Sequence, residues 1–204
     1  MTWADPQLTE TGIRQAEGLG NLLAELVRTA GLPLPGTVYT SPLARCLETT
    51  RLVWTPPFAS SSPSPPPAAP VAGADATTAT STRLRPLVKE RLRERMAPHT
   101  CDRRGERGTI ANRYPDYVLE ADMAEGPDPL WKAHRDETDE QHVARKQALL
   151  EEVFANDDAT FVALNTHLFA ISAILGVLDA PRFLVAEGAL VPLLVKATKV
   201  GEER

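Results

Sequence analysis

The sequence predicts a three-layer α/β/α sandwich with a mixed, mainly parallel sheet. Short β-forming stretches alternate with longer stretches of helical periodicity, as expected of a sheet covered by helices. Residues 160–165 form a continuous apolar run bounded by turn-forming residues, which is typical of a buried strand. With 204 residues, 43% of them hydrophobic, the chain can bury one core. We therefore predict a single domain over residues 1–200, followed by a charged tail at 201–204.

The first predicted elements are a helix, a strand and a second helix. Apolar residues recur at three- and four-residue steps over residues 12–27, and Thr9 is placed to cap this helix. A glycine and two prolines end it. β-forming residues at 38–39 predict a short buried strand, which turns abruptly into a helix over residues 42–53 with Ser41 as its N-cap.

The composition changes sharply at residues 55–82, where proline, serine and alanine are abundant. Such a segment cannot bury enough apolar surface to offset its ordering entropy, so we expect a disordered surface insertion; the alternative is a ligand for proline-reading domains. A short edge strand is expected at residues 84–90. Residues 95–136 show little periodicity, and a long ordered loop of this kind is usually functional.

The C-terminal half predicts a helix, a strand, a helix and a hairpin. A threonine-capped helix is expected over residues 138–154. Residues 160–165 are expected to be a fully buried strand, and residues 168–178 an apolar helix. Residues 182–186 and 190–198 are expected to form two final strands.

Composition argues against several classes of function. The net charge of -5 and the lack of a basic stripe argue against nucleic acid as a partner. Cys46 and Cys101 show neither the dense pattern of a disulfide scaffold nor metal-ligand spacing, so we expect reduced thiols, no metal and no cofactor. No apolar run reaches the roughly 18 residues of a membrane span, and no secretory leader is evident. We expect a soluble, cytoplasmic protein without membrane contact.

Arg45 lies one turn into the helix that follows the strand at residues 38–39. Free backbone N–H groups and the positive end of the helix dipole make such a helix start a place where a phosphoryl group binds. The alternative is an arginine that merely solvates the start of the helix.

Five motifs occur together along the chain: Asp5–Ala16, Ser41–Arg45, Leu92–Glu94, His99–Arg104 and Thr166–His167. In order and approximate separation they resemble the histidine phosphatase superfamily, also called phosphoglycerate-mutase-like, and its fungal-type branch in particular. The resemblance covers nearly the whole chain except residues 55–82 and the C-terminal tail. It implies hydrolysis through a phosphohistidine formed on an Arg-His-Gly motif, with a second histidine, two arginines and a general acid, beneath a long covering loop at 95–136.

Three residues match functional positions of that superfamily. Arg45 matches a phosphate-binding arginine, whose guanidinium suits two phosphoryl oxygens at once. His167 matches the second histidine, which stabilises charge on the phosphoryl group when protonated; the alternative is a hydrogen-bonded core histidine. Glu94 matches the acid that protonates the leaving oxygen; the alternative is a solvated charge, with Glu90 as a rival acid.

His99, Arg103 and Arg104 are weaker candidates for contacts to a substrate anion. A solvated cluster of charges is an equally good interpretation of each of them. The partner that these residues imply is a small phosphorylated or carboxylated ligand.

The chain departs from the superfamily pattern in two places. It contains no Arg-His-Gly, and Met1 already lies in the segment that follows the first family strand. We therefore expect that strand, the usual nucleophile and one phosphate-binding arginine to be missing. Leu168 and Phe169 follow His167 where small residues are common in the superfamily, and we expect them to crowd the phosphate pocket.

The expected function is that of a histidine-phosphatase-fold protein that acts on or binds a phosphorylated small molecule, with weak or absent phosphomonoesterase activity. The alternatives are a shortened form of an active phosphatase, a noncatalytic pseudo-enzyme that binds a ligand or partner, and a lyase, isomerase or cyclase that uses Glu94 and His167 as acid and base. Without the first family strand, residues 160–165 need a new partner. We expect the C-terminal strands to pair with them in a five-stranded sheet, with a second copy of the chain, recruited through an unpaired edge, as the alternative.

Overall fold

The computed structural model describes residues 3–54 and 84–198 of the protein, so the disordered insertion expected at 55–82 lies outside the described residues. Within the described residues a parallel sheet has the strand order β3-β2-β1-β4. Its strands are β1 (Thr37–Thr40), β2 (Leu87–Val88), β3 (Val118–Leu119) and β4 (Val162–Asn165).

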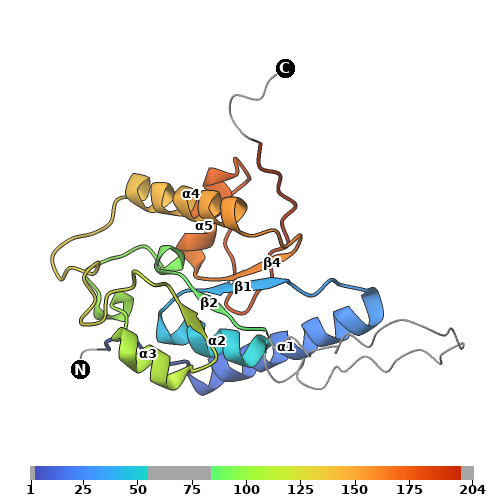
Figure 1. The fold of residues 1–204 in the computed structure, drawn as a ribbon, viewed down its shortest axis with the longest axis horizontal. Helices are drawn as coiled ribbons and strands as arrows, with labels where there is room; N and C mark the ends of the chain where they lie inside the picture. The colour runs from blue at the N-terminus through green and yellow to red at the C-terminus, as the bar shows by residue number, and fades with distance from the viewer. Residues whose placement is uncertain (1–2, 55–83, 199–204) are drawn as a thin grey trace, which may run out of the picture.

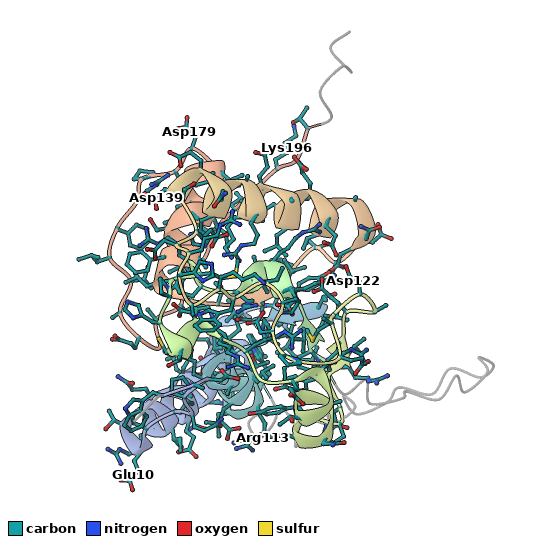
Figure 2. All side chains as sticks on the ribbon, turned by 90° about the vertical axis from the view of Figure 1, so that its left-hand side faces the viewer. Glu10, Arg113, Asp122, Asp139, Asp179 and Lys196 are labelled. Carbon is teal, nitrogen blue, oxygen red and sulfur yellow. The ribbon has the colours of Figure 1, made fainter. Side chains whose placement is uncertain are left out.

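Helices cover both faces of this sheet, as Figure 1 shows. One layer holds α4 (Asp139–Asn156) and α5 (Leu168–Val177); the other holds α1 (Glu10–Ala30), α2 (Ala44–Trp54) and α3 (Arg107–Arg113). Figure 2 shows side chains filling the space between the sheet and both layers, with Glu10 and Arg113 on the α1–α3 side and Asp179 on the α4–α5 side. The predicted α/β/α fold class is confirmed.

β1 is the centre of the sheet. It pairs with β4 from Thr37 opposite Val162 to Thr40 opposite Asn165, and with β2 on its other side. Its middle residue Tyr39 is 5% exposed and packs against α4, where its hydroxyl donates a hydrogen bond of 2.7 Å to Asp157. The β-forming residues Val38 and Tyr39 identified this strand in the sequence.

The predicted caps of two helices are confirmed. The Thr9 side chain accepts a hydrogen bond of 3.1 Å from Gly12 N at the start of α1, and Gly31 ends that helix in the left-handed conformation with φ 67°. Thr138 forms a full capping box with Gln141 at the start of α4.

The segment 95–136 is more structured than a covering loop. Besides α3 and β3 it contains a 3-10 turn, η2 (Thr100–Asp102). Side chains from this segment form a hydrophobic cluster with α2 and β2: Ile110, Tyr114, Tyr117 and Met123 pack with Leu47 and Val88. The segment therefore supplies part of the core as well as a cover, and its elements are too short to produce a readable period.

An ion pair without solvent contact anchors this segment to the chain after β2. Arg93 and Asp128 have side chains with 0% exposure and lie 2.5 Å apart through Arg93 Nη2 and Asp128 Oδ2. A second hydrogen bond of 2.9 Å joins Nη1 to Oδ1, and Nη2 also donates to the Asp102 carbonyl at 2.5 Å. Paired in this bidentate way, the two charges tolerate burial.

The prediction of a C-terminal hairpin is wrong. Residues 182–186 and 190–198 form no strands, so the described sheet is parallel and four-stranded, not mixed and five-stranded. Pro192 cannot donate to a strand ladder, and Leu184 and Leu194 are 91% and 103% exposed, so these apolar residues find no face to cover.

The expectation of a fully buried strand at residues 160–165 is also wrong. β4 is an edge strand that pairs with β1, and no second strand lies beside it in the described part of the chain. Phe161 and Val162 are 51% and 38% exposed. An apolar run of this length fits an edge strand as well as a buried one, because local sequence does not specify the neighbours of a strand.

Candidate functional site

Three chain segments meet at the end of the sheet where its parallel strands have their carboxyl ends. Because β1, β2 and β4 are parallel, their carboxyl ends lie together, which is where open α/β sheets bind ligands. Ser41 follows β1, Glu94 follows β2 after the 3-10 turn η1 (Glu90–Leu92), and His167 follows β4. The topology thus brings the three best sequence-predicted residues, Arg45, Glu94 and His167, to the carboxyl ends of the strands.

His167 stands at the N-terminus of α5 and is 8% exposed. Its Nε2 lies 2.9 Å from Ser41 Oγ and 3.4 Å from Cys46 Sγ. Burial, together with the nearby positive charge of Arg45, holds the pKa of the imidazole well below its usual 6.5. The ring is therefore neutral at pH 7, and the serine hydroxyl can donate to Nε2.

Glu94 is held by two backbone N–H groups. Arg95 N donates to its Oε1 at 2.8 Å, and Phe169 N, from the first turn of α5, donates to its Oε2 at 3.3 Å. Burial raises the pKa of the carboxyl, against the lowering effect of these hydrogen bonds and of the nearby Lys146 and Arg45 charges. A raised pKa is what a carboxyl needs in order to donate a proton near neutral pH.

Arg45 points from α2 toward residues 95–136, here called the covering segment. Its Nη1 donates to the Cys101 carbonyl at 2.8 Å, and its Nη2 lies 3.7 Å from Asp102 Oδ1. The guanidinium charge contributes to the pKa of both Glu94 and His167, so the three groups share one electrostatic neighbourhood. A ligand that bound Arg45 would compete with the contacts to Cys101 and Asp102.

Asp5 was not among the sequence-predicted site residues, although it opens the first motif. Its Oδ1 accepts from Ala44 N and its Oδ2 from Gly105 N, both at 2.8 Å. This carboxylate, rather than Ser41, therefore occupies the start of α2, where the predicted anion would bind, and Ser41 Oγ is 3.4 Å from Leu43 N. Burial raises the pKa of Asp5.

Of the three weaker candidates, His99 and Arg103 both contact Trp131, whereas Arg104 is buried in an internal network. His99 is exposed, and its carbonyl accepts from the Trp131 indole at 3.0 Å. Arg103 stacks over the Trp131 ring at 5.7 Å. Arg104 is 3% exposed and donates to Glu90, to the Gly105 carbonyl and to the Ala124 carbonyl.

Glu90, the rival acid, also forms an ion pair with Arg93. These partners hold Glu90 and Arg104 in an internal network, whereas the charge of Arg45 acts on the carboxyl of Glu94.

Two basic residues of α4 hold the segment that carries Glu94. Lys146 has 0% exposure and donates to the carbonyls of Arg91 and Arg93 at 2.5 and 2.6 Å. Arg145 donates to the same two carbonyls and, at 2.9 Å, to the Glu94 carbonyl, while Glu137 pairs with its guanidinium. Sequence reasoning missed both residues, because a lysine in a mixed polar helix is normally exposed.

Two cavities of about 170 and 690 Å³ lie elsewhere on the molecule, and neither is lined by Arg45, Glu94 or His167. Phe169, which was expected to crowd the phosphate pocket together with Leu168, is 55% exposed. No group of three or more potential metal ligands comes together among the described residues.

The arrangement suits charge stabilisation and proton transfer at a bound anion. Arg45 provides a fixed positive charge, Glu94 a carboxyl poised to donate a proton, and His167 an imidazole that gains a proton readily once an anion binds beside it. His142, the other buried histidine, lies on α4 and is kept neutral by burial and by neighbouring cations, with its pKa lowered to about 3.

The amino-acid sequence matches a known protein family and several fungal proteins. A family model described as "Histidine phosphatase superfamily (branch 1)" matches residues 1–56. A "Probable phosphoglycerate mutase" from Arthroderma benhamiae is 37% identical over 196 residues, which are 96% of this chain and 52% of the relative. A "Probable phosphoglycerate mutase PMU1" from Saccharomyces cerevisiae is 31% identical over 192 residues, which are 88% of this chain and 60% of the relative. The chain thus spans about half the length of these curated relatives.

The solved structures agree on the fold. The ecdysone phosphate phosphatase of Bombix mori, in complex with tungstate, aligns with 97% of this chain and 63% of its own at a TM-score of 0.50 and 20% identity. At this identity the likeness concerns the fold alone. The family model over the first part of the chain and the fungal relatives over most of it agree: this chain is similar to members of the histidine phosphatase superfamily.

Proposed function

We propose that this chain binds the phosphoryl group of a small phosphate monoester at the edge of the sheet where Arg45, Glu94 and His167 meet. Arg45 holds the phosphoryl oxygens, His167 takes up a proton and stabilises their charge, and Glu94 protonates the leaving oxygen. The observation that carries this proposal is the convergence of the three groups, from three different segments, beyond the carboxyl ends of β1, β2 and β4.

Entry of the anion requires a local rearrangement. Arg45 now binds the Cys101 carbonyl and Asp102, and Asp5 occupies the start of α2. A phosphoryl group offers more charge and more acceptor oxygens than these partners, so it displaces η2 from Arg45. The pKa of His167 rises when the anion is bound, which couples phosphate binding to proton uptake.

We propose that these 204 residues hydrolyse phosphate monoesters at a rate near the uncatalysed background. The sequence holds no Arg-His-Gly, and its histidines are His99, His134, His142 and His167. Of these, His167 is the one at the strand ends with Arg45 and Glu94, and a nucleophile and a charge-stabilising group must be separate. For the whole protein we propose action on a phosphorylated small molecule, a class that includes the substrates named for the relatives.

A second candidate is acid–base chemistry without a phosphoenzyme, as in a lyase, isomerase or cyclase. The observation that favours it is the pair of opposed pKa shifts, which leaves Glu94 more readily protonated and His167 neutral. Under this alternative a carboxylated ligand binds Arg45 in place of a phosphate.

The test is a titration of the chain with inorganic phosphate, followed by ¹H–¹⁵N NMR and calorimetry. Binding should be seen, and Arg45→Ala should weaken it about tenfold to hundredfold, the effect of removing a charge-assisted hydrogen bond. Arg28→Ala is the matched control, because Arg28 is an exposed arginine in the last turn of α1. Equal phosphate affinity in the Arg45 and Arg28 variants would remove the site assignment.

Turnover of p-nitrophenyl phosphate is measured on the same samples. We expect a rate near the uncatalysed background. Robust turnover that disappears in His167→Ala and Arg45→Ala would overturn the proposal that these residues bind without rapid hydrolysis, while keeping the site.

We further propose a cytoplasmic protein whose partners are small anions, not nucleic acids or membranes, and which self-associates through β4. Two observations support these proposals. The described part of the chain has no helix with the length and apolar character needed to span a bilayer. β4 is an edge strand with exposed Phe161 and Val162, and such an edge can pair with a second copy.

A further inference from the structure

Phe169 is a large apolar side chain exposed beside a buried polar site. It is the second residue of α5 and lies two positions after His167, yet its ring is 55% exposed. Side chains of a helix tilt toward its N-terminus, so a ring at this position leans toward the segment that holds His167 and Glu94. An exposed aromatic ring at such a place is a feature of ligand-binding sites.

Arg95 fixes this ring from one side. Its guanidinium carbon lies 5.6 Å from the centroid of the Phe169 ring, a cation–π contact. Arg95 also forms a 3.0 Å ion pair with Asp139, the first residue of α4, which is labelled in Figure 2 on the α4–α5 side. One face of the ring is covered in this way, and the exposed remainder can receive a second planar group.

Arg95 and Phe169, here called the platform, also hold Glu94, the proposed acid. Arg95 N donates to one carboxylate oxygen of Glu94, and Phe169 N donates to the other. The acid and the platform are therefore fixed to the same backbone and keep a constant relation to each other. A leaving group that accepts the proton of Glu94 must emerge next to Arg95 and Phe169.

We propose that Phe169 and Arg95 form the leaving-group subsite, and that it selects phosphate monoesters of aromatic alcohols. This inference rests on the function proposed above, because it takes Glu94 as the group facing the leaving oxygen. The phosphoryl group binds Arg45 and His167, and the aromatic leaving group stacks on the free surface of the Phe169 ring. A small aliphatic leaving group gains no such contact.

The experiment compares three ligands of the chain: inorganic phosphate, methyl phosphate and phenyl phosphate, with dissociation constants taken from NMR titrations. Phenyl phosphate should bind about threefold to tenfold more tightly than methyl phosphate, the range expected of one aromatic pair. Phe169→Ala should bring this ratio close to one while the affinity for inorganic phosphate stays unchanged. Arg95→Gln should lower the ratio in part, because the ring loses its fixed orientation.

Phe154→Ala is the matched control. Phe154 is also helical and is 44% exposed, but it lies near the C-terminal end of α4. The phenyl-to-methyl ratio should keep its wild-type value in this variant. Because both rings are exposed, neither substitution should prevent folding, and thermal unfolding of each variant verifies this.

The outcomes separate the inference from the function on which it rests. A ratio near one in the wild-type chain, or a ratio that Phe169→Ala leaves unchanged, overturns the leaving-group subsite even when phosphate binds through Arg45. Absence of phosphate binding, or phosphate binding that does not depend on Arg45, overturns the proposed function together with the subsite.

Discussion

The amine of Lys146 lies in surroundings very different from water. Its amine is fully buried against two backbone carbonyls, and burial, with the nearby Arg145 charge, lowers its pKa to about 6. The unfolded chain binds this proton up to a pH near 10.5, whereas the folded chain releases it near 6. Between those values the unfolded state binds more protons, so the contribution of Lys146 to stability increases as the pH rises.

The prediction at this scale is a pH-dependent effect of Lys146→Met. Wild-type protein should gain free energy of unfolding between pH 6.5 and pH 8.5, and the methionine variant should lose most of that gain. Urea unfolding at both pH values measures it, with the exposed Lys132→Met as the control. Parallel pH dependence in wild type and Lys146→Met would show that the amine stays charged in the folded protein.

Single residues of the site were predictable to the extent that short motifs carry them. Arg45, Glu94 and His167 stand at strand ends and helix starts, where sequence patterns are informative. Lys146 and Asp5 act through contacts with residues far away in the sequence, and no local pattern encodes such a partner.

Among the elements, α2 depends on a cap that comes from outside its own sequence neighbourhood. Asp5 accepts from Ala44 N and from Gly105 N, so one carboxylate serves α2 and the covering segment together. Removal of this side chain leaves two backbone donors without their partner, and each such group costs about 1–3 kcal/mol when it is buried.

We therefore predict that Asp5→Ala lowers the free energy of unfolding by about 2 kcal/mol, the combined loss of a cap and a tether. Asp5→Asn should cost less, because the amide keeps one acceptor oxygen, and it should strengthen phosphate binding because a negative charge near Arg45 is gone. Urea unfolding and phosphate titration measure the two effects, with the exposed Gln7→Ala as the control. Weaker phosphate binding in Asp5→Asn would contradict the view that this carboxylate competes with the ligand.

The elements themselves were predictable where they are long. α1 and α4 have periodic apolar residues and a threonine cap, and α5 is a ten-residue apolar run. β3 has two residues and α3 has seven, which is too little for a period to show. The strand expected at residues 84–90 is present as β2, but it lies between β1 and β3 and is not an edge strand as expected. The C-terminal segment had the composition of strands but no partner in the fold, and strand formation depends on a partner.

For the whole molecule, the open side of β4 is the feature with the clearest consequence for behaviour in solution. Val162 in this strand and Phe161 just before it are exposed, and the backbone groups on this side have no neighbouring strand in the described residues. Natural proteins protect such edges with charged side chains, and lysine is the usual choice.

The prediction is concentration-dependent association that Val162→Lys suppresses. Sedimentation velocity over a hundredfold range of concentration should show dimers or larger species in the wild type and mainly monomer in the variant. Val118→Lys is the control, since Val118 is 37% exposed on β3, the strand at the opposite edge of the sheet, and this edge is only two residues long. A wild-type chain that stays monomeric at all concentrations would contradict association through β4.

The position of Asp5 also bears on the order in which the molecule folds. Its two hydrogen bonds join residues separated by 39 and by 100 positions along the chain. Contacts of such long range form only after the entropy of closing the intervening loops has been lost, so they come late on the folding pathway. Substitutions of Asp5 should accordingly accelerate unfolding and leave the folding rate almost unchanged. We therefore expect the carboxylate that occupies the candidate anion site to take its place late in folding and to leave it early in unfolding.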